Sequence, residues 1–423
     1  MNRFIFDKYY FDEDELTAYF NYKFENGDEF IESVVFEVES KYDRAILDRA
    51  LFLAFVIIGT SYYKAFPSVE VVIKQPIDEW QKQFFDSVYQ EGLSQYAYEN
   101  NLSRDNLANF VFREDIIVEE LPNYHGAGVL VLQSGGKDSL LVATMLNKKN
   151  TIYTPWYLSS GDSHPSILDG LGQKLSIAKR YIDKKSLASV SQKGAKNGHV
   201  PVTYINQSIA IIQAILLNKS TIISSIAHEG EEPYTTIGDL DVMHQWSKTW
   251  QAELNIAEYV RRYISANIKI GSPIRDLSEL RVAELFVHNT WEDYGHSFSS
   301  CNVANYKQGS DNSDLKWCGD CPKCANSYLL FAPFLPAAEL QSIFGGQDLF
   351  EKLSLSDTFM GLLGVGNSIR PFECIGEVEE LRLAYHMSQA KGGYSSLSFE
   401  VLESDFDYMQ KYQSQGWATE MLQ

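Results

Sequence analysis

Cysteine is scarce in this chain, with five copies among 423 residues. Four of them lie between positions 301 and 324, which is typical of a metal site in a reducing compartment rather than of a disulfide framework. We also find no apolar run of about eighteen residues, the length that a membrane span needs. The first fifteen residues lack the basic and then apolar segments of a signal peptide. The sequence therefore predicts a cytoplasmic protein without membrane contact.

Basic residues are also in short supply, with 36 Lys and Arg against 56 Asp and Glu and a formal net charge of −20. Proteins that bind nucleic acid neutralise its phosphates with Lys and Arg. The basic pairs Lys148-Lys149 and Lys184-Lys185 are short and isolated. This composition favours a small-molecule substrate and argues against a nucleic-acid partner. The oligomeric state is not indicated.

The most informative segment that is present reads VLVLQSGGKDS, residues 129–139. Its first four residues predict a buried parallel strand, and residues 138–147 predict a helix. The glycine turn between them lets backbone N–H groups approach an anion at the N-terminus of that helix. The alternative is a purely structural turn, but five specified positions coincide by chance only about once in a million windows. We therefore expect a nucleotide-binding loop.

This loop differs from the common P-loop, because Asp138 stands where a Ser or Thr would hold magnesium. It resembles instead the PP-loop of the ATP pyrophosphatase superfamily, whose members release pyrophosphate and transfer AMP to a carboxylate or carbonyl oxygen. The resemblance implies an ATP site made by Ser134, Gly135, Gly136, Lys137, Asp138 and Ser139. Backbone N–H groups would hold the pyrophosphate, Asp138 would position Mg²⁺, and Lys137 would neutralise the leaving group. A solvated side chain is the alternative for Lys137.

The chain around this loop is expected to fall into three parts. Residues 1–122 predict an α+β module with a hairpin (16–24 and 30–38), helices (43–63 and 79–96) and a strand (69–73). Residues 123–300 predict an α/β domain with a doubly wound parallel sheet, with further strands at 151–157, 200–204 and 221–227. A helix is expected at 206–217, and another from a capping box, Asp276 with Glu279. Residues 301–423 predict a mostly helical region.

The cysteine cluster predicts a four-ligand metal site. Cys318, Cys321 and Cys324 have the two-residue gaps that let thiolates converge on one ion, and Cys301 supplies a fourth. A full shell of four thiolates leaves no position for water, so we expect structural Zn²⁺. A [4Fe–4S] cluster and four unmetallated thiols are the alternatives. Cys374 is expected to be a buried apolar residue, with a reactive nucleophile as its alternative.

Several patches, in order, resemble the MurL family of ATP-dependent epimerases of UDP-N-acetylmuramoyl-L-alanyl-L-glutamate. They read SGGKDS (134–139), NGHVPVT (197–203), VMHQWSKTW (242–250), SCN (300–302), WCGDCPKC (317–324) and PFECIGE (371–377). The resemblance covers nearly the full length, with departures at Gln133-Ser134 and at AHEGEEP, residues 227–233. The cysteines also resemble those of 7-cyano-7-deazaguanine synthase, a PP-loop enzyme that adenylates a deazapurine carboxylate and has relatives in anti-phage systems. A catalytically inactive nucleotide-binding scaffold is the third possibility.

The resemblance implies that a substrate carboxylate is adenylated, which makes the neighbouring carbon acidic enough to epimerise. Epimerisation needs two proton carriers on opposite faces of that carbon. His199 is the first choice, His244 with Lys248 the second, and His228 a further candidate, each with a structural role as its alternative. Residues that could supply a base, a magnesium ligand or a cation for a dicarboxylate are Glu229, Glu231, Glu232, Arg262, Lys248 and Arg275.

Overall fold

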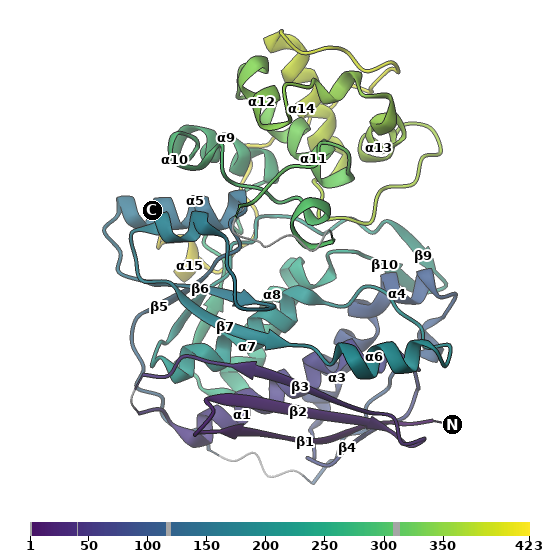
Figure 1. Ribbon diagram of the computed structural model, residues 1–423, viewed down its shortest axis with the longest axis vertical. Helices are drawn as coiled ribbons and strands as arrows, with labels where there is room; N and C mark the ends of the chain where they lie inside the picture. The colour runs from purple at the N-terminus through teal and green to yellow at the C-terminus, as the bar shows by residue number, and fades with distance from the viewer. Residues whose placement is uncertain (1, 40, 116–119, 308–313) are drawn as a thin grey trace.

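A nine-stranded mixed sheet organises the molecule (Figure 1). The computed structural model describes residues 2–39, 41–115, 120–307 and 314–423. Five strands are parallel and lie in the order β11-β8-β5-β6-β7, which is a doubly wound order with its centre at β5. Their bounds are β5 Val129–Leu132, β6 Thr154–Ser159, β7 Ser176–Tyr181, β8 Thr221–Ile223 and β11 Lys269–Gly271. The predicted strands at 129–132, 151–157 and 221–227 are confirmed, with shifted ends.

The N-terminal strands extend this same sheet. They are β1 (Phe4–Asp12), β2 (Thr17–Phe24), β3 (Glu29–Val35) and β4 (Val71–Ile73). The predicted hairpin of β2 and β3 is confirmed, and β3 pairs antiparallel with β7 through Val34 and Arg180. Residues 4–35 and the parallel strands therefore share one hydrogen-bonded ladder. The division of the chain at residues 122 and 300 stays a prediction.

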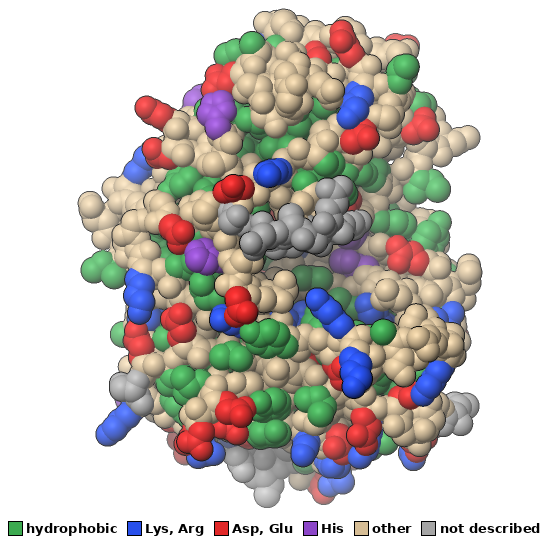
Figure 2. Space-filling model, in the orientation of Figure 1, with side chains coloured by type: hydrophobic (Ala, Val, Ile, Leu, Met, Phe, Trp, Pro, Cys, Tyr) green, Lys and Arg blue, Asp and Glu red, His purple; other side chains and the backbone are tan. Residues whose placement is uncertain are grey.

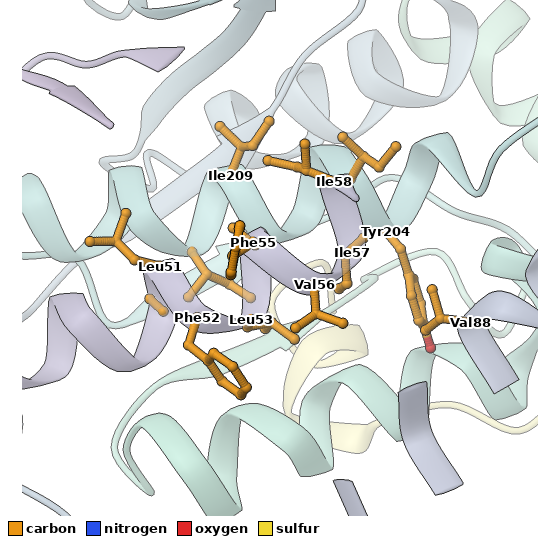
Figure 3. Packing of buried hydrophobic residues seen from close by; sticks show 14 of the residues in the cluster. Leu51, Phe52, Leu53, Phe55, Val56, Ile57, Ile58, Val88, Tyr204 and Ile209 are labelled. Carbon is orange, nitrogen blue, oxygen red and sulfur yellow. The ribbon is translucent and has the colours of Figure 1, made fainter. Parts of the chain in front are cut away.

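One apolar helix forms the centre of the core beneath the sheet. Helix α1 (Arg44–Ile58) begins where the Asp43 carboxylate accepts hydrogen bonds from the backbone N–H groups of Ala45 and Ile46, and α2 (Thr60–Tyr63) continues it. By length and composition alone, residues 44–63 could cross a membrane, but 83% of their most apolar window is buried inside the protein. In Figure 3, Phe55 and Ile58 of α1 lie among side chains of neighbouring helices, as in the core helix of a globular domain.

The helices that pack with α1 on this side are α3 (Glu79–Tyr89), α7 (Val202–Leu216) and α8 (Trp250–Tyr259). Smaller elements nearby are α4 (Ser94–Glu99), α6 (Lys184–Ser191) and the hairpin of β9 (Thr235–Ile237) and β10 (Leu240–Val242). The predicted helices at 43–63 and 206–217 are thus confirmed. The one predicted at 79–96 is interrupted after Tyr89.

Two local predictions are wrong. The strand expected at 200–204 is the start of α7, because Pro201 at its N-cap has no N–H to give a sheet and its fixed φ suits a helix start. The cap expected at Asp276 is instead Ser278, whose hydroxyl accepts a hydrogen bond from the Arg281 N–H at the start of α9 (Glu279–Asn289). Asp276 forms an ion pair with Lys411.

A second core covers the opposite face of the sheet. Val131 and Ile223 point into it, whereas their neighbours Leu130 and Ile222 point into the first core, as alternation along a strand requires. Helices α5 (Lys137–Lys148) and α9 lie on this face, beneath the mostly helical C-terminal region that was predicted (Figure 1). That region contains α10 (Trp291–Tyr294), α11 (Pro322–Phe331), α12 (Ala337–Ile343), α13 (Ser356–Leu362) and α14 (Val378–Lys391).

The chain ends as a strap that returns to the sheet. The Ser278 hydroxyl donates to the carbonyl of Tyr408, and the Gln415 amide donates to the carbonyl of Ile270 in the edge strand β11. The short helix α15 (Gly416–Thr419) follows, and its Trp417 ring lies over Gly271. The last residues therefore press against one edge of the sheet.

Candidate active site

A cavity of about 520 Å³ opens where the strand order reverses, between β5 and β8. Its walls are the predicted loop (132–134, 138 and 139), the end of β6 (156–158 and 160), the start of α7 (202, 203 and 206), residues 224–226, Lys248 and Asn302. Helix α5 leaves β5 on one face and α7 approaches β8 on the other, so backbone does not close the crevice. This is the position in which open α/β sheets bind ligands.

The glycine turn is tightly enclosed. Gly135 has φ of +77°, and a Cβ there would lie 2.6 Å from Leu315 Cδ1. A Cβ on Gly136 would lie 3.0 Å from the Ser300 hydroxyl oxygen. Residues next to the cysteine cluster thus touch the loop directly. Only glycine satisfies both the backbone conformation and the close packing at position 135.

Lys137 lies at the centre of a buried charge cluster rather than in solvent. Its ammonium nitrogen is 2.6 Å from an oxygen of Asp138 and 2.6 Å from an oxygen of Glu279, and its side chain is 8% exposed. Burial alone would lower the pKa of Lys137, but the two carboxylates raise it, so the ammonium stays charged. The second oxygen of Glu279 is buried without a partner among the described residues. An incoming cation or donor would satisfy it.

A second ion pair extends this cluster to the cavity wall. The Lys248 ammonium lies 3.0 Å from a carboxylate oxygen of Glu229, which is itself buried. Burial would raise the pKa of Glu229, but the charges of Lys248, Lys137 and Lys323 lower it. Burial would lower the pKa of Lys248, whereas the neighbouring Cys374 and Glu229 raise it. Cys374 is therefore half-buried beside an ammonium group, which corrects the prediction of an apolar environment.

The structure brings His199 and His244 together, with ring centroids 4.4 Å apart. Burial lowers the pKa of His199 to about 3, assisted by the neighbouring His244 and Lys64, and burial lowers that of His244 to about 4. Both rings are thus neutral at pH 7. His244 and Lys248 are not on one helix, since residues 246–248 form a single 3₁₀ turn. The pair lies outside the cavity lining, near its Lys248 wall.

Several predicted substrate contacts are used elsewhere in the fold. Arg275 is fully buried in an ion pair with Glu253, and Arg262 pairs with Glu258 and covers the Trp80 ring. Glu231 accepts a hydrogen bond from the Trp250 N–H, and Glu232 pairs with Arg370. The ring of His228 stacks on Tyr412 at 3.5 Å between centroids. All five residues therefore have partners within the protein, and the two arginines already pair with carboxylates. The roles predicted for these residues stay predictions.

The four clustered cysteines converge on one point. All four sulfurs lie within 4.8 Å of one another, with Cys301–Cys321 and Cys318–Cys324 at 3.7 Å and Cys321–Cys324 at 3.5 Å. A tetrahedral ion about 2.3 Å from each sulfur separates them by about 3.8 Å. A four-iron cluster needs wider spacing because each thiolate binds a different iron. The donor set therefore fits a single tetrahedral ion.

Three residues of the site had no role in it predicted from the sequence. Glu279 contacts Lys137, which lies 142 positions away in the sequence. Lys323, from the cysteine knuckle (residues 318–324), acts on the charge cluster. Gln133 was noted only as a departure from a pattern, yet its buried amide lines the cavity with neither polar atom partnered among the described residues. Of the three, only Gln133 could have been suspected from the sequence, because it departs from the family pattern directly before the glycine turn.

Comparison with known proteins covers most of the chain. Residues 1–272 match the MurL N-terminal domain, and residues 297–415 match the MurL C-terminal domain. The chain belongs to the MurL family. Among its relatives is the UDP-N-acetyl-alpha-D-muramoyl-L-alanyl-L-glutamate epimerase of Micromonospora sp., which is 31% identical over 392 residues, 90% of this chain and 85% of the relative.

Two further MurL relatives carry the same name. The protein from Xanthomonas oryzae pv. oryzae is 31% identical over 369 residues, and this alignment covers 86% of the chain and 80% of the relative. The protein from Salinispora tropica is 30% identical over 402 residues, and this alignment covers 93% of the chain and 86% of the relative. The predicted family resemblance is thereby confirmed over nearly the full length of the chain.

Proposed function

We propose that this protein is a cytoplasmic, ATP-dependent epimerase that inverts the terminal glutamate of UDP-N-acetylmuramoyl-L-alanyl-L-glutamate during synthesis of peptidoglycan precursors. The names of the relatives support the substrate and the reaction. The observation that carries the ATP dependence is the glycine turn beside a 520 Å³ cavity at the switch point, with Lys137 and Asp138 next to it. A cavity of this size is of the order that a nucleotide-sized ligand requires.

The chemistry explains why ATP is needed. Removing the α-proton of a carboxylate places a second negative charge beside the first. Transfer of AMP to the α-carboxylate neutralises that charge and makes the α-carbon more acidic. Pyrophosphate leaves ATP in this transfer. Deprotonation of the α-carbon, return of a proton on the other face and hydrolysis of the acyl adenylate by water then give the epimer and AMP.

Residues of the glycine turn, the charge cluster and the histidine pair would each contribute to one step of this reaction. Backbone N–H groups of Gly135, Gly136 and Lys137 would hold the pyrophosphate at the N-terminus of α5. Asp138 would hold Mg²⁺, which spans phosphate oxygens and offsets their charge. The rings of His199 and His244 are neutral at pH 7, which is the form that a general base requires, so they remain our candidates for the proton carriers.

Replacing Asp138 by Asn tests the nucleotide site. We expect AMP formation with the muramoyl dipeptide to fall at least about a hundredfold, because the neutral amide binds Mg²⁺ poorly. Asp357→Asn is the matched control, since Asp357 is also in the first turn of a helix, α13, but lies far along the chain from the cavity lining. AMP, pyrophosphate and the chirality of the product glutamate are measured together.

Wild-type protein that releases ADP, or that inverts glutamate without ATP, would contradict the proposal. AMP release with a deazapurine carboxylate, and none with the dipeptide, would instead support a synthase-like activity.

We also infer that Cys301, Cys318, Cys321 and Cys324 hold structural Zn²⁺, because their spacing suits a single tetrahedral ion. Elemental mass spectrometry of the purified protein should find about one zinc per chain. Removing zinc should lower the melting temperature, because the bound ion links Cys301 to the three cysteines at 318–324 and so stabilises the folded segment between them. Iron with acid-labile sulfide in the fresh protein would overturn this assignment.

A further inference from the structure

The cysteine knuckle places one more cation in the active site. Lys323 lies between the metal-ligand positions Cys321 and Cys324, at the start of α11. Its ammonium donates a hydrogen bond to the backbone carbonyl of Cys374. Lys323 also acts electrostatically on Glu229, Glu279 and His244, so it lies near the charge cluster, beside the segment that contains Cys374.

Lys323 differs from the other two lysines of the cluster because no carboxylate among the described residues pairs with it. Lys137 pairs with Asp138 and Glu279, and Lys248 pairs with Glu229. In the part of the chain that the structure describes, Lys323 forms no ion pair, and its one hydrogen bond uses one of three donors. The segment that Lys323 contacts at Cys374 is also contacted, at Glu373, by Asn302 of the cavity wall. A half-buried ammonium with spare donors at this place is arranged for an anion.

We propose that Lys323, together with Lys248, binds the side-chain carboxylate of the acceptor's terminal acidic residue, while the neighbouring α-carboxylate is adenylated. The inference rests on the proposed function, because that substrate carries both carboxylates. It also replaces the cations predicted at Arg262 and Arg275, which are used in structural ion pairs.

The position of Lys323 favours a carboxylate over the pyrophosphate of ATP. The phosphate-binding groups lie at the glycine turn, where Lys137 is already held by Asp138. Lys323 instead lies beside the segment 370–377 and near His244. The acceptor must bind in this region if its α-carbon is to reach the candidate proton carriers. Asn302, which lines the cavity, contacts the same segment through the Glu373 carboxylate. The cysteine knuckle thereby joins metal binding to acceptor recognition.

The test compares Lys323→Met with Lys352→Met, both in the intact zinc-loaded protein. Lys352 also lies beside the knuckle, but it contacts the Gly319 carbonyl and pairs with Asp320. We expect Lys323→Met to raise the KM for the muramoyl dipeptide about tenfold or more, the usual loss for a charged hydrogen bond. The KM for ATP and the zinc content should stay within about twofold, and Lys352→Met should change none of these values.

A substrate analogue gives a second readout that needs no variant. With the terminal glutamate replaced by glutamine, the wild type should show a KM at least about tenfold higher, because the neutral amide loses the charged contact. Lys323→Met should discriminate little between the two substrates, and Lys323→Arg should restore part of the preference.

Equal KM values for the two substrates in the wild type would overturn the inference, as would a rise in the KM for ATP alone. Wild-type protein that forms no AMP with either dipeptide would refute the proposed function, and the inference with it. The two failures are therefore distinguishable.

Discussion

At the scale of single residues, Gln133 offers unpaired hydrogen-bonding groups to a ligand in the cavity. Its buried side-chain amide has neither polar atom partnered among the described residues. A buried amide without hydrogen bonds costs about 1–3 kcal/mol, which a ligand can recover on binding. We therefore expect Gln133→Met, which conserves volume, to raise the melting temperature of the free protein by roughly 2–4 °C.

The same substitution should reduce the increase in melting temperature that saturating ATP produces, since the ligand loses a partner. Gln213 is the control, because its buried amide already donates to the carbonyl of Glu37. Gln213→Met should lower the melting temperature and leave the ATP effect unchanged. Both are measured by thermal unfolding with and without ATP and Mg²⁺. A Gln133→Met protein with wild-type ATP stabilisation would contradict the role of this amide.

At the scale of elements, a carboxyl group on α14 joins that helix to α9. Glu380 is 1% exposed, and its carboxyl oxygen accepts a hydrogen bond from the Leu280 N–H, 2.7 Å away. Burial raises the pKa of Glu380 to about 8, with the nearby Glu279 and Glu377 acting in the same direction. The unfolded chain releases this proton near pH 4.5, whereas the folded protein keeps it to about pH 8.

Because the folded state then binds more protons than the unfolded state, this group makes the free energy of unfolding fall as pH rises from about 4.5 to 8. Glu380→Gln keeps the acceptor oxygen and removes the titration. It should therefore raise the melting temperature at pH 8 by a few degrees and leave it nearly unchanged at pH 5. Glu379→Gln, its exposed neighbour, should have little effect at either pH. An equal gain at both pH values would contradict the explanation.

The glycine loop was predictable from the sequence because the residues that determine its structure are close together in the chain. An apolar strand, a glycine turn and a helix follow one another within twenty residues, and each has its own periodicity. The pairing of Lys137 with Glu279 was not predictable, because it joins positions 142 apart and depends on how α9 docks against α5. Strand β1 was missed because the charged residues of its first half, Asp7 and Lys8, interrupt the apolar alternation.

At the scale of the whole molecule, the continuous sheet and the helix α1 tie the N-terminal third to the rest. Strand β3 covers the edge of β7, and α1 covers the apolar surface of α7. A chain cut to residues 123–423 would expose both surfaces, so we expect it to aggregate rather than unfold cooperatively. Size-exclusion chromatography and thermal unfolding check this.

Co-expression of residues 1–122 with that fragment should restore a soluble complex, because the same ladder and core can form between two chains. A monomeric 123–423 fragment with a cooperative transition would contradict this, because it would show that these residues fold without the N-terminal third.

The strap at the end of the chain has a consequence for how the protein is made. Because Gln415 and Trp417 lie against Ile270 and Gly271, the edge strand β11 is covered only after residues 415–417 have been synthesised and have folded back. Until then its backbone groups can pair with another nascent copy. A variant without the strap, residues 408–423, would therefore leave the outer side of β11 uncovered and should self-associate.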